Sequence, residues 1–266
     1  MIENFEKLLK KYFCFKQESR VLEASKYSLF LGGKRLRPLI LLDVAKSIGE
    51  VDSNIERLSC SLEVTHTYSL IHDDLPCMDN DDFRRGKPSC HVQYDYATAV
   101  LAGDLLLNSA IEIALQGDIT NQNYLRAVSY LFNCSGADGM ILGQSLDIFG
   151  NKSSKEDIIN IAEYKTAKLF SASIMCPVIY FGLASDENSK FIDISRALGV
   201  AFQLIDDLLD SEKVEENSIL KVCTLVEARK IAIDYLNIAE KALNELPYSL
   251  NFLRKALFDL KNKANI

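Results

Sequence analysis

The sequence has few residues that break regular structure, with 5 prolines and 12 glycines among 266 residues. The apolar–polar alternation of half-buried strands is also hard to find, whereas apolar residues recur at the spacing of an α-helix. Polar segments between the periodic stretches are short, as in connections between antiparallel helices. The sequence contains no long linker, low-complexity tract or internal repeat. We therefore expect a single all-α domain spanning residues 1–266.

The periodicity predicts helices over most of the chain. They cover roughly residues 2–15, 19–31, 35–49, 54–75, 92–116, 121–133, 135–148, 155–182, 190–212, 223–246 and 248–263. The segments 92–116 and 168–183 are apolar on most sides, which is typical of helices buried centrally. A bundle with such central helices can hold a ligand site between them.

Further absences exclude whole classes of protein. The seven cysteines form no C-x-x-C pair, so we expect reduced thiols in a cytoplasmic protein. No apolar run approaches the ~20 residues that span a bilayer, because Asp43 and Asp104 interrupt the candidate runs. The N-terminal segment carries acids, unlike a signal peptide. The net charge of −7 argues against a nucleic-acid partner. We expect a soluble protein without a membrane span.

Five aspartates followed at once by three cations occupy residues 72–87, HDDLPCMDNDDFRRGK. The predicted helix before them places four residues on one face: Leu62, His66, Ser69 and Asp73. Asp79 would lie about 240° round an unbroken helix from Asp73, but Pro76 ends or kinks that helix. We therefore expect a turn after Asp73 that returns Asp79 to its side.

A second acidic cluster lies in AFQLIDDLLD, residues 201–210. Its polar members occupy neighbouring rows of one otherwise apolar helix: Gln203, Asp206, Asp207 and Asp210. Carboxylates on an apolar face are costly unless they are paired or bind a metal ion. Either cluster alone fits a helix cap or a solvated face as well. Two such clusters in apolar helices favour a bound cation.

Magnesium is the cation that this donor set fits. Oxygen ligands without a Cys/His set indicate Mg²⁺ rather than Zn²⁺, and the three histidines form no i,i+4 pair. Mg²⁺ held by a few carboxylates completes its shell with water and substrate phosphate. Magnesium and a diphosphate are therefore the expected occupants.

Basic residues supply an anion-binding side. The segment GGKRLRP, residues 32–38, places Lys34 and Arg37 on one face at a predicted helix start, beside exposed N–H groups. Arg84 and Arg85 offer planar guanidinium groups to phosphate oxygens. By itself GGKRLRP fits a solvated basic turn, but together with two aspartate clusters it indicates phosphate binding.

The segments together resemble the trans-isoprenyl diphosphate synthases, most closely the bacterial farnesyl diphosphate synthases (geranyltranstransferases). The matching segments follow the family's order over about residues 25–212: GGKRLRP, HTYSLIHDDLPCMDNDDFRRGKPSCH, LAGDLLL, GMILGQSLD, YKTAKLF and AFQLIDDLLD. The resemblance implies an all-α bundle around a deep central cavity, usually in a homodimer, with Mg²⁺ as cofactor. It also implies a reaction, the head-to-tail condensation of isopentenyl diphosphate with dimethylallyl or geranyl diphosphate.

The resemblance assigns roles by position. The expected magnesium ligands are Asp73, Asp74, Asp79, Asp206, Asp207 and Asp210. The expected contacts of isopentenyl diphosphate are Lys34, Arg37, His66 and Arg85. The positions that hold the allylic diphosphate or flank the reacting carbons are Arg84, Lys165, Thr166 and Gln203. The residues on which catalysis is expected to depend most are Asp73, Asp79, Asp206, Lys165 and Gln203.

Tyr68 and Ser69 are expected to set the product length. A chain that grows from a diphosphate at Asp73 extends back along the preceding helix, and Tyr68 lies roughly 7.5 Å earlier on its axis. The resemblance to bacterial farnesyl synthases includes a tyrosine at this position, so C15 farnesyl diphosphate is the expected product. The alternative is that Tyr68 is a packed core aromatic whose hydroxyl has a hydrogen-bond partner.

Two departures from the family pattern leave alternatives open. The segment after Asp210 is short and lacks the usual Gly-Lys, and neither Lys213 nor Lys221 aligns securely as its replacement. The usual Lys-Thr-Gly reads Lys-Thr-Ala at residues 165–167. The alternatives are a C20 geranylgeranyl diphosphate synthase and a non-catalytic partner subunit with the same fold. Because all six motif aspartates are present, an enzyme is favoured.

Overall fold

The computed structural model describes residues 1–210 and 218–264. The chain divides into two compact units. The first unit contains Met1–Leu39 and Val51–Thr120, and the second contains Ile40–Glu50 and Asn121–Ile266. The prediction that residues 1–266 form one domain stays a prediction.

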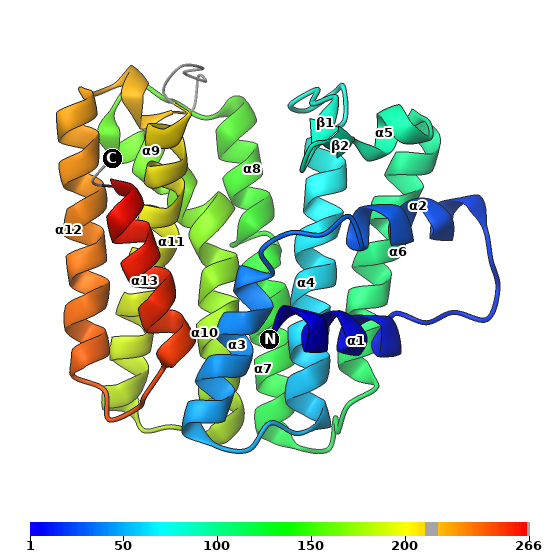
Figure 1. Ribbon diagram of the computed structural model, residues 1–266, viewed down its shortest axis with the longest axis horizontal. Coiled ribbons are helices and arrows are strands. Elements are labelled where there is room, and N and C mark those ends of the chain that lie inside the picture. Colours follow the sequence, from blue (N-terminus) through cyan, green and yellow to red (C-terminus); the bar gives the residue numbers. More distant parts are fainter. Residues whose placement is uncertain (211–217, 265–266) are drawn as a thin grey trace. The chain divides into compact units, whose positions relative to one another are not determined.

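The first unit is built on two long helices, α4 and α6, which pack along each other (Figure 1). Its elements are α1 (Ile2–Tyr12), α2 (Arg20–Leu29), α4 (Ser53–Asp73), β1 (Phe83–Arg84), β2 (Lys87–Pro88), α5 (Cys90–Gln93) and α6 (Tyr96–Leu115). Helix α1 packs on α4, and α2 packs on both long helices. The strands form an antiparallel hairpin beyond the C-terminal end of α4.

Helix α4 begins and ends where local chemistry requires. The Asp52 side chain accepts hydrogen bonds from the backbone N–H groups of Asn54 and Ile55, both at 3.0 Å, and so caps the first turn. The helix ends at Asp73, ahead of Pro76, which has no N–H to continue the ladder. The predicted face that carries His66, Ser69 and Asp73 is therefore helical throughout.

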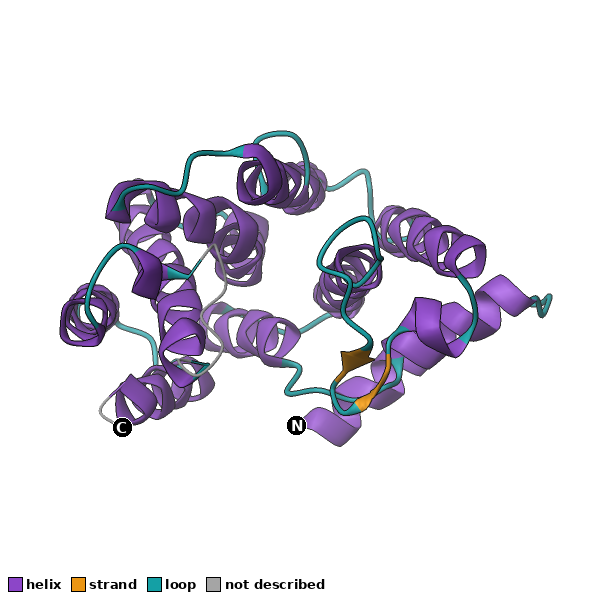
Figure 2. Ribbon diagram, turned by 90° about the horizontal axis from the view of Figure 1, so that it is seen from above, coloured by secondary structure: helices purple, strands orange, loops and turns teal. Residues whose placement is uncertain are grey.

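The second unit is a group of helices around α10 and α11. Figure 2, drawn from above, shows many helices of the chain end-on. Its elements are α7 (Gln122–Ser135), α8 (Met140–Phe149), α9 (Lys155–Ala162), the π-helix η1 (Glu163–Ala167), α10 (Lys168–Phe181), α11 (Ser185–Leu209), the 3-10 helix η2 (Ile219–Lys221), α12 (Leu225–Asn244) and α13 (Asn251–Ala264). Helix α11 packs against α10 and α12, and α10 packs against α7. Phe170 and Phe191 are fully buried in this core.

Helix α3 (Leu36–Ile48) begins in the first unit and continues into the second. Its Asp43, which interrupts an apolar run in the sequence, accepts hydrogen bonds from the N–H groups of Phe252 and Leu253 at 3.0 Å each. The carboxylate thus satisfies backbone donors in the first turn of α13. The charge of Asp43 in an apolar segment is therefore explained by its bonds to the start of α13.

The all-α class is confirmed, with two local corrections among the described residues. A short hairpin with two residues in each strand, β1 and β2, lies in a chain whose sequence shows little strand pattern. The predicted helix 155–182 is continuous but contains the π-helical turn η1 at residues 163–167. Both features are too short to change the periodicity of the sequence.

Helix α6 also corrects the statement that no apolar segment has the length of a membrane span. Its 20 residues are long enough and apolar enough to cross a bilayer by length and composition alone, despite Asp104 and Glu112. About half of the helix is buried inside the structure, where α6 packs against α4 and α2. A core helix meets the same criterion of length and composition.

Candidate active site

The first aspartate cluster lies on the C-terminal end of α4 and the turn that follows it. The backbone N–H of Asp79 donates to the carbonyl oxygen of Asp73 at 2.9 Å, and the N–H of Met78 donates to Leu75 at 2.8 Å. The chain therefore doubles back after Asp73, which confirms the predicted return of Asp79 at the level of the backbone. Asp73 is half-buried and Asp79 is exposed.

Asp74, by contrast, is tied to a predicted substrate-binding residue. The Nε of Arg84 donates to the two carboxylate oxygens at 2.9 and 3.2 Å, and its Nη2 also bonds the carboxylate. Asp74 has a side-chain exposure of 3%, and burial raises its pKa while Arg84 opposes that shift. A paired, buried carboxylate of this kind fixes Arg84 against α4.

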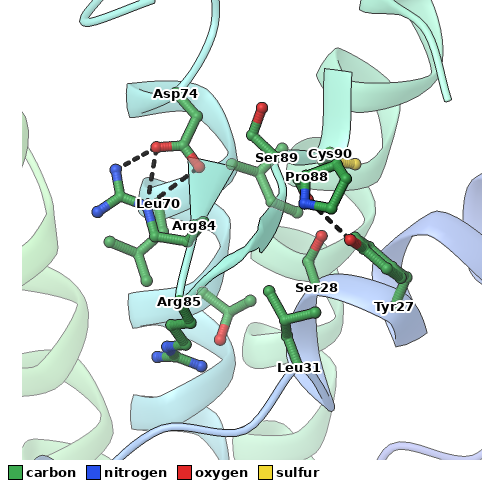
Figure 3. Close-up of a pocket in the computed structure, with 12 residues that line it drawn as sticks. Tyr27, Ser28, Leu31, Leu70, Asp74, Arg84, Arg85, Pro88, Ser89 and Cys90 are labelled. Atoms are coloured by element: carbon green, nitrogen blue, oxygen red, sulfur yellow. Dashed lines mark hydrogen bonds and ion pairs between the residues drawn. The ribbon is translucent and has the colours of Figure 1, made fainter. Parts of the chain in front are cut away.

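The hairpin turn separates the two neighbouring arginines. Arg85 and Gly86 have φ values of 55° and 73°, as in the two-residue turn that best joins antiparallel strands. Figure 3 shows the guanidinium of Arg84 turned toward Asp74 and that of Arg85 turned away. Both line a small pocket, partly open to solvent, between α2, α4 and the hairpin.

The Gly-Gly loop receives Arg85. The Nη1 of Arg85 donates to the carbonyl oxygen of Gly32. Gly33 has a φ of 125°, and a Cβ there would lie 2.6 Å from the Arg85 guanidinium carbon. Glycine is needed both for this conformation and for this approach. Helix α3 begins only at Leu36, so the prediction that Lys34 shares a helix face with Arg37 is wrong; Lys34 lies exposed in the loop.

The structure brings Arg37 and His66 together, as the motif predicts. Their Nη1 and Nε2 atoms are 3.4 Å apart. Burial, together with Arg37, Arg85, Arg35 and Arg84, holds the pKa of His66 well below its usual range. The imidazole is therefore neutral at pH 7 and lies in a region lined by four arginines. Such a region is suited to an anion.

In the second unit, the π-helix η1 presents Lys165. Its Nζ lies 2.6 Å from Oδ2 of Asp147, a buried residue of α8. Helix α8 can approach this closely because residue 143 is glycine: a Cβ there would lie 2.0 Å from the backbone nitrogen of Lys165. Single π-helical turns within α-helices are frequent at functional sites.

The next residue starts a chain of hydrogen bonds along α11. Thr166 donates from Oγ1 to Oε1 of Gln203 at 2.8 Å, and Gln203 donates from Nε2 to Oδ1 of Asp207 at 3.0 Å. The other Asp207 oxygen accepts from the N–H of Ile219 at 2.8 Å. Burial raises the pKa of Asp207 and these donors oppose it. Asp207 thus has protein partners for both oxygens.

Asp206 and Asp210 complete the second cluster at the end of α11. Asp206 is half-buried, and Asp210 is the exposed C-cap residue, whose N–H donates to the Asp206 carbonyl at 3.0 Å. Lys221 is exposed in η2, and Lys213 lies outside the described residues. Ala167, which departs from the family pattern, packs closely against Gly199 of α11. A Cβ at residue 199 would lie 2.3 Å from the Cα of Ala167. The additional methyl group is accommodated by a glycine on α11.

Tyr68 is buried in α4, with 5% of its surface exposed. Its ring packs edge-on to His72 at 6.0 Å between centroids. Its hydroxyl has no hydrogen-bond partner among residues 1–210 and 218–264, and burial raises its pKa to about 12. Ser69 donates to the carbonyl of His66 at 2.9 Å. The described residues therefore do not supply the hydrogen-bond partner that a core tyrosine with a satisfied hydroxyl would need.

The site fits magnesium through the chemical type of its oxygen donors and not through a complete set of ligands around one point. Within the part of the chain that the structure describes, no group of three Asp, Glu, His or Cys side chains is close enough to hold a metal ion. Asp74 and Asp207 are engaged by Arg84, Gln203 and Ile219. The remaining carboxylates are hard oxygen donors, and Mg²⁺ commonly takes one or two of these plus substrate phosphate.

Sequence reasoning missed three residues of these sites. Asp147 pairs with Lys165, and its position in GMILGQSLD was the available signal. Arg35 lies inside GGKRLRP, and its buried partner Glu63 precedes His66 by three residues. Spacing could not identify these pairs, because each joins two different helices or a loop and a helix.

Comparison with known proteins gives one consistent family. The polyprenyl synthetase family model matches residues 18–246. The chain is 40% identical over 214 residues to the farnesyl diphosphate synthase of Micrococcus luteus, covering 80% of this chain and 73% of that protein. It is also 40% identical over 215 residues to a chloroplastic geranylgeranyl pyrophosphate synthase of Capsicum annuum, covering 79% of this chain and 58% of that protein.

Solved structures agree over nearly the whole length. The geranyltransferase of Legionella pneumophila has a TM-score of 0.91 at 31% identity, with 100% of this chain and 95% of that chain covered. The geranyltransferase of Helicobacter pylori, solved with magnesium and isoprenyl diphosphate, has a TM-score of 0.85 at 30% identity, covering 98% and 94%. The chain belongs to the polyprenyl synthetase family.

Proposed function

We propose that this protein is a Mg²⁺-dependent short-chain prenyltransferase. It condenses isopentenyl diphosphate head to tail with dimethylallyl or geranyl diphosphate and releases farnesyl diphosphate. Family membership and the farnesyl diphosphate synthases among its relatives support the reaction class. The observation that carries the proposal is the environment of His66, where a neutral imidazole lies among four arginines and contacts Arg37.

Isopentenyl diphosphate is assigned to this basic region. Lys34 is exposed in the loop, Arg37 contacts His66, and Arg85 is held against Gly32. Each side chain is a donor, and guanidinium groups match the paired oxygens of a diphosphate. His66 adds a donor without adding charge.

Magnesium is assigned to Asp73 and Asp79 in the first unit and to Asp206 and Asp210 in the second. When bound, it supplies positive charge that stabilises the allylic diphosphate as it departs. Asp74 and Asp207 orient protein donors in the present structure. We infer that these two act mainly by holding Arg84 and Gln203 in place.

The allylic diphosphate is assigned to Arg84 and Lys165. Each is held by a buried carboxylate, Asp74 or Asp147, which fixes its direction and leaves other N–H donors for an oxyanion. Thr166 and Gln203 form the polar chain next to Lys165 and are assigned to the reacting carbons. The surrounding apolar helices exclude water from a carbocation.

Tyr68 is assigned to the floor of the chain-growth path, with Ser69 beside it, and this assignment favours a C15 product. Its buried hydroxyl has no partner among the residues that the structure describes, which supports a place next to a ligand rather than inside ordinary core packing. A C20 geranylgeranyl product is the second candidate, supported by the Capsicum relative. A non-catalytic partner subunit is disfavoured by the six aspartates.

A cytoplasmic homodimer is the proposed form of the protein. Helix α6 exposes apolar residues along the side that does not pack on α4 and α2: Tyr96, Val100, Leu101, Ile111 and Leu115. Exposed apolar side chains gathered on one side of a helix are typical of protein–protein contacts. A second copy of the chain would cover it.

The test is an incubation of purified protein with Mg²⁺, isopentenyl diphosphate and geranyl diphosphate, with product length read by chromatography. We expect C15 product that disappears in EDTA. Mainly C20 product would identify the protein as a geranylgeranyl diphosphate synthase, the second candidate. Absence of condensation with any allylic diphosphate would support the partner-subunit reading.

A further inference from the structure

Arg35 is a buried cation in the middle of the predicted substrate loop. Its side chain is fully covered, and three of its nitrogens have short contacts with acceptors. Nε donates to Glu6 of α1 at 2.7 Å, Nη1 to Glu63 of α4 at 2.6 Å, and Nη2 to the carbonyl of Leu29 at 2.6 Å. One guanidinium group thus joins α1, α4 and the end of α2.

The backbone at Arg35 adopts a conformation that requires such anchoring. Its φ is 48°, in the left-handed region, which is unfavourable for a residue with a Cβ. Gly32 and Gly33 also have positive φ values, of 94° and 125°. The loop therefore turns inward at Arg35, and this inward turn leaves Lys34 exposed and starts α3 at Leu36.

Glu63 gives this anchor its electrostatic role. It has 2% of its surface exposed, and its carboxylate interacts with Arg35, Arg85 and Arg37. Glu63 therefore pairs with Arg35 and also lies near Arg85 and Arg37, so it helps to order the guanidinium groups around His66, one turn further along α4.

Glu6 lies outside the family-matched segment, which begins at residue 18. Its helix, α1, packs on α4 through the buried side chains of Phe5 and Leu9. The Glu6 side chain is 27% exposed, so its replacement need not disturb the core. It offers a way to perturb Arg35 from outside the substrate region.

We propose that Arg35, held by Glu6 of α1 and Glu63 of α4, is a positioning residue that sets the affinity of the 32–37 loop for isopentenyl diphosphate. This inference rests on the proposed function, since it concerns the site assigned to that substrate. Helix α1 is accordingly part of the substrate-binding apparatus, although it contributes no group that touches the diphosphate. Lysine at position 35 would keep the charge but could not bridge three acceptors in fixed directions.

The test compares Glu6→Gln and Arg35→Lys with Glu3→Gln, an exposed change on the same helix. We expect Glu6→Gln and Arg35→Lys to raise the KM for isopentenyl diphosphate by about tenfold, on the scale of a charged hydrogen bond. The KM for geranyl diphosphate and kcat should remain within about twofold. Glu3→Gln should match the wild type. A merely structural role would lower the melting temperature and the active fraction without this selective change in KM.

Lys34→Ala in the same series separates this inference from the proposed function. If Lys34→Ala raises the KM for isopentenyl diphosphate while Glu6→Gln and Arg35→Lys do not, the positioning role of Arg35 is overturned alone. If the wild type condenses but Lys34→Ala has no effect on that KM, the loop is not the substrate site and the inference falls with it. If the wild type does not condense at all, the proposed function fails and the inference, which depends on it, is overturned with it.

Discussion

Arg84 and Asp74 form a buried ion pair between the hairpin and the end of α4, with Nε contacts of 2.9 and 3.2 Å. Two residues assigned different ligands by resemblance, an allylic diphosphate and a metal ion, are thus partners in this structure. The carboxylate is almost completely buried, whereas Arg84 is 31% exposed on its outer side. The pair therefore has a structural role in addition to any role in binding.

Arg84→Ala should lower the free energy of unfolding, because it leaves the Asp74 carboxylate buried without its cation. We expect a loss of about 2 kcal/mol in urea unfolding. The double variant Asp74→Asn/Arg84→Ala should recover part of that loss, because the buried charge is gone. Lys87→Ala, an exposed change in the same hairpin, is the control and should have little effect. Equal stabilities of Arg84→Ala and Lys87→Ala would contradict the role of the pair.

Condensation should depend on magnesium through particular aspartates. We expect EDTA to abolish product formation and Asp73→Asn to lower kcat by at least about a hundredfold, since charge stabilisation at the leaving group is lost. Asp82→Asn, an exposed change in the same acidic segment, should retain activity. Circular dichroism should show unchanged helix content in both variants. Substantial turnover by Asp73→Asn would remove the assigned ligand.

The stability of the protein should depend on pH through His66. Its pKa in the folded state lies below the ordinary value of about 6.5, so the unfolded chain binds a proton first as pH falls. Stability is therefore greatest above that value and is lost as pH falls toward the folded pKa, by at most about 1.4 kcal/mol per pH unit. His66→Gln, which cannot protonate, should lack this component.

The measurement for His66 is urea unfolding of both proteins from pH 7.5 to pH 5. The difference in unfolding free energy between wild type and His66→Gln isolates this residue from the carboxylates that titrate at lower pH. Below about pH 6.5 the wild type should lose unfolding free energy relative to His66→Gln. Parallel curves would show that the pKa of His66 is not lowered by its burial and the neighbouring arginines.

Two substitutions at Tyr68 separate its ring from its hydroxyl. Tyr68→Ala should open the floor assigned to it and shift the product from C15 toward C20. Tyr68→Phe should keep C15 product and full stability, because the hydroxyl has no partner among the described residues. Chromatography of the products reports the first effect, and thermal unfolding reports the second. Unchanged chain length in Tyr68→Ala would place the floor elsewhere.

The sequence by itself determined the all-α class, most helix positions and the residue types of the site. Apolar residues at helical spacing define long helices such as α4 and α11 wherever they pack. Pro76 required a break after Asp73, and the observed turn returns the backbone of Asp79 to it. These features follow from local sterics and periodicity.

Only the tertiary structure decided which charged groups are partners. Asp73 and Asp74 are adjacent and identical in type, yet it is Asp74 that is buried against Arg84. Arg35 looks like one more cation in GGKRLRP, but Glu6 and Glu63 make it an anchor. The hairpin and the π-helical turn are likewise too short to leave a periodic signal. Such pairings depend on how helices distant in sequence pack together, because that packing decides which side chains lose water and must find a partner.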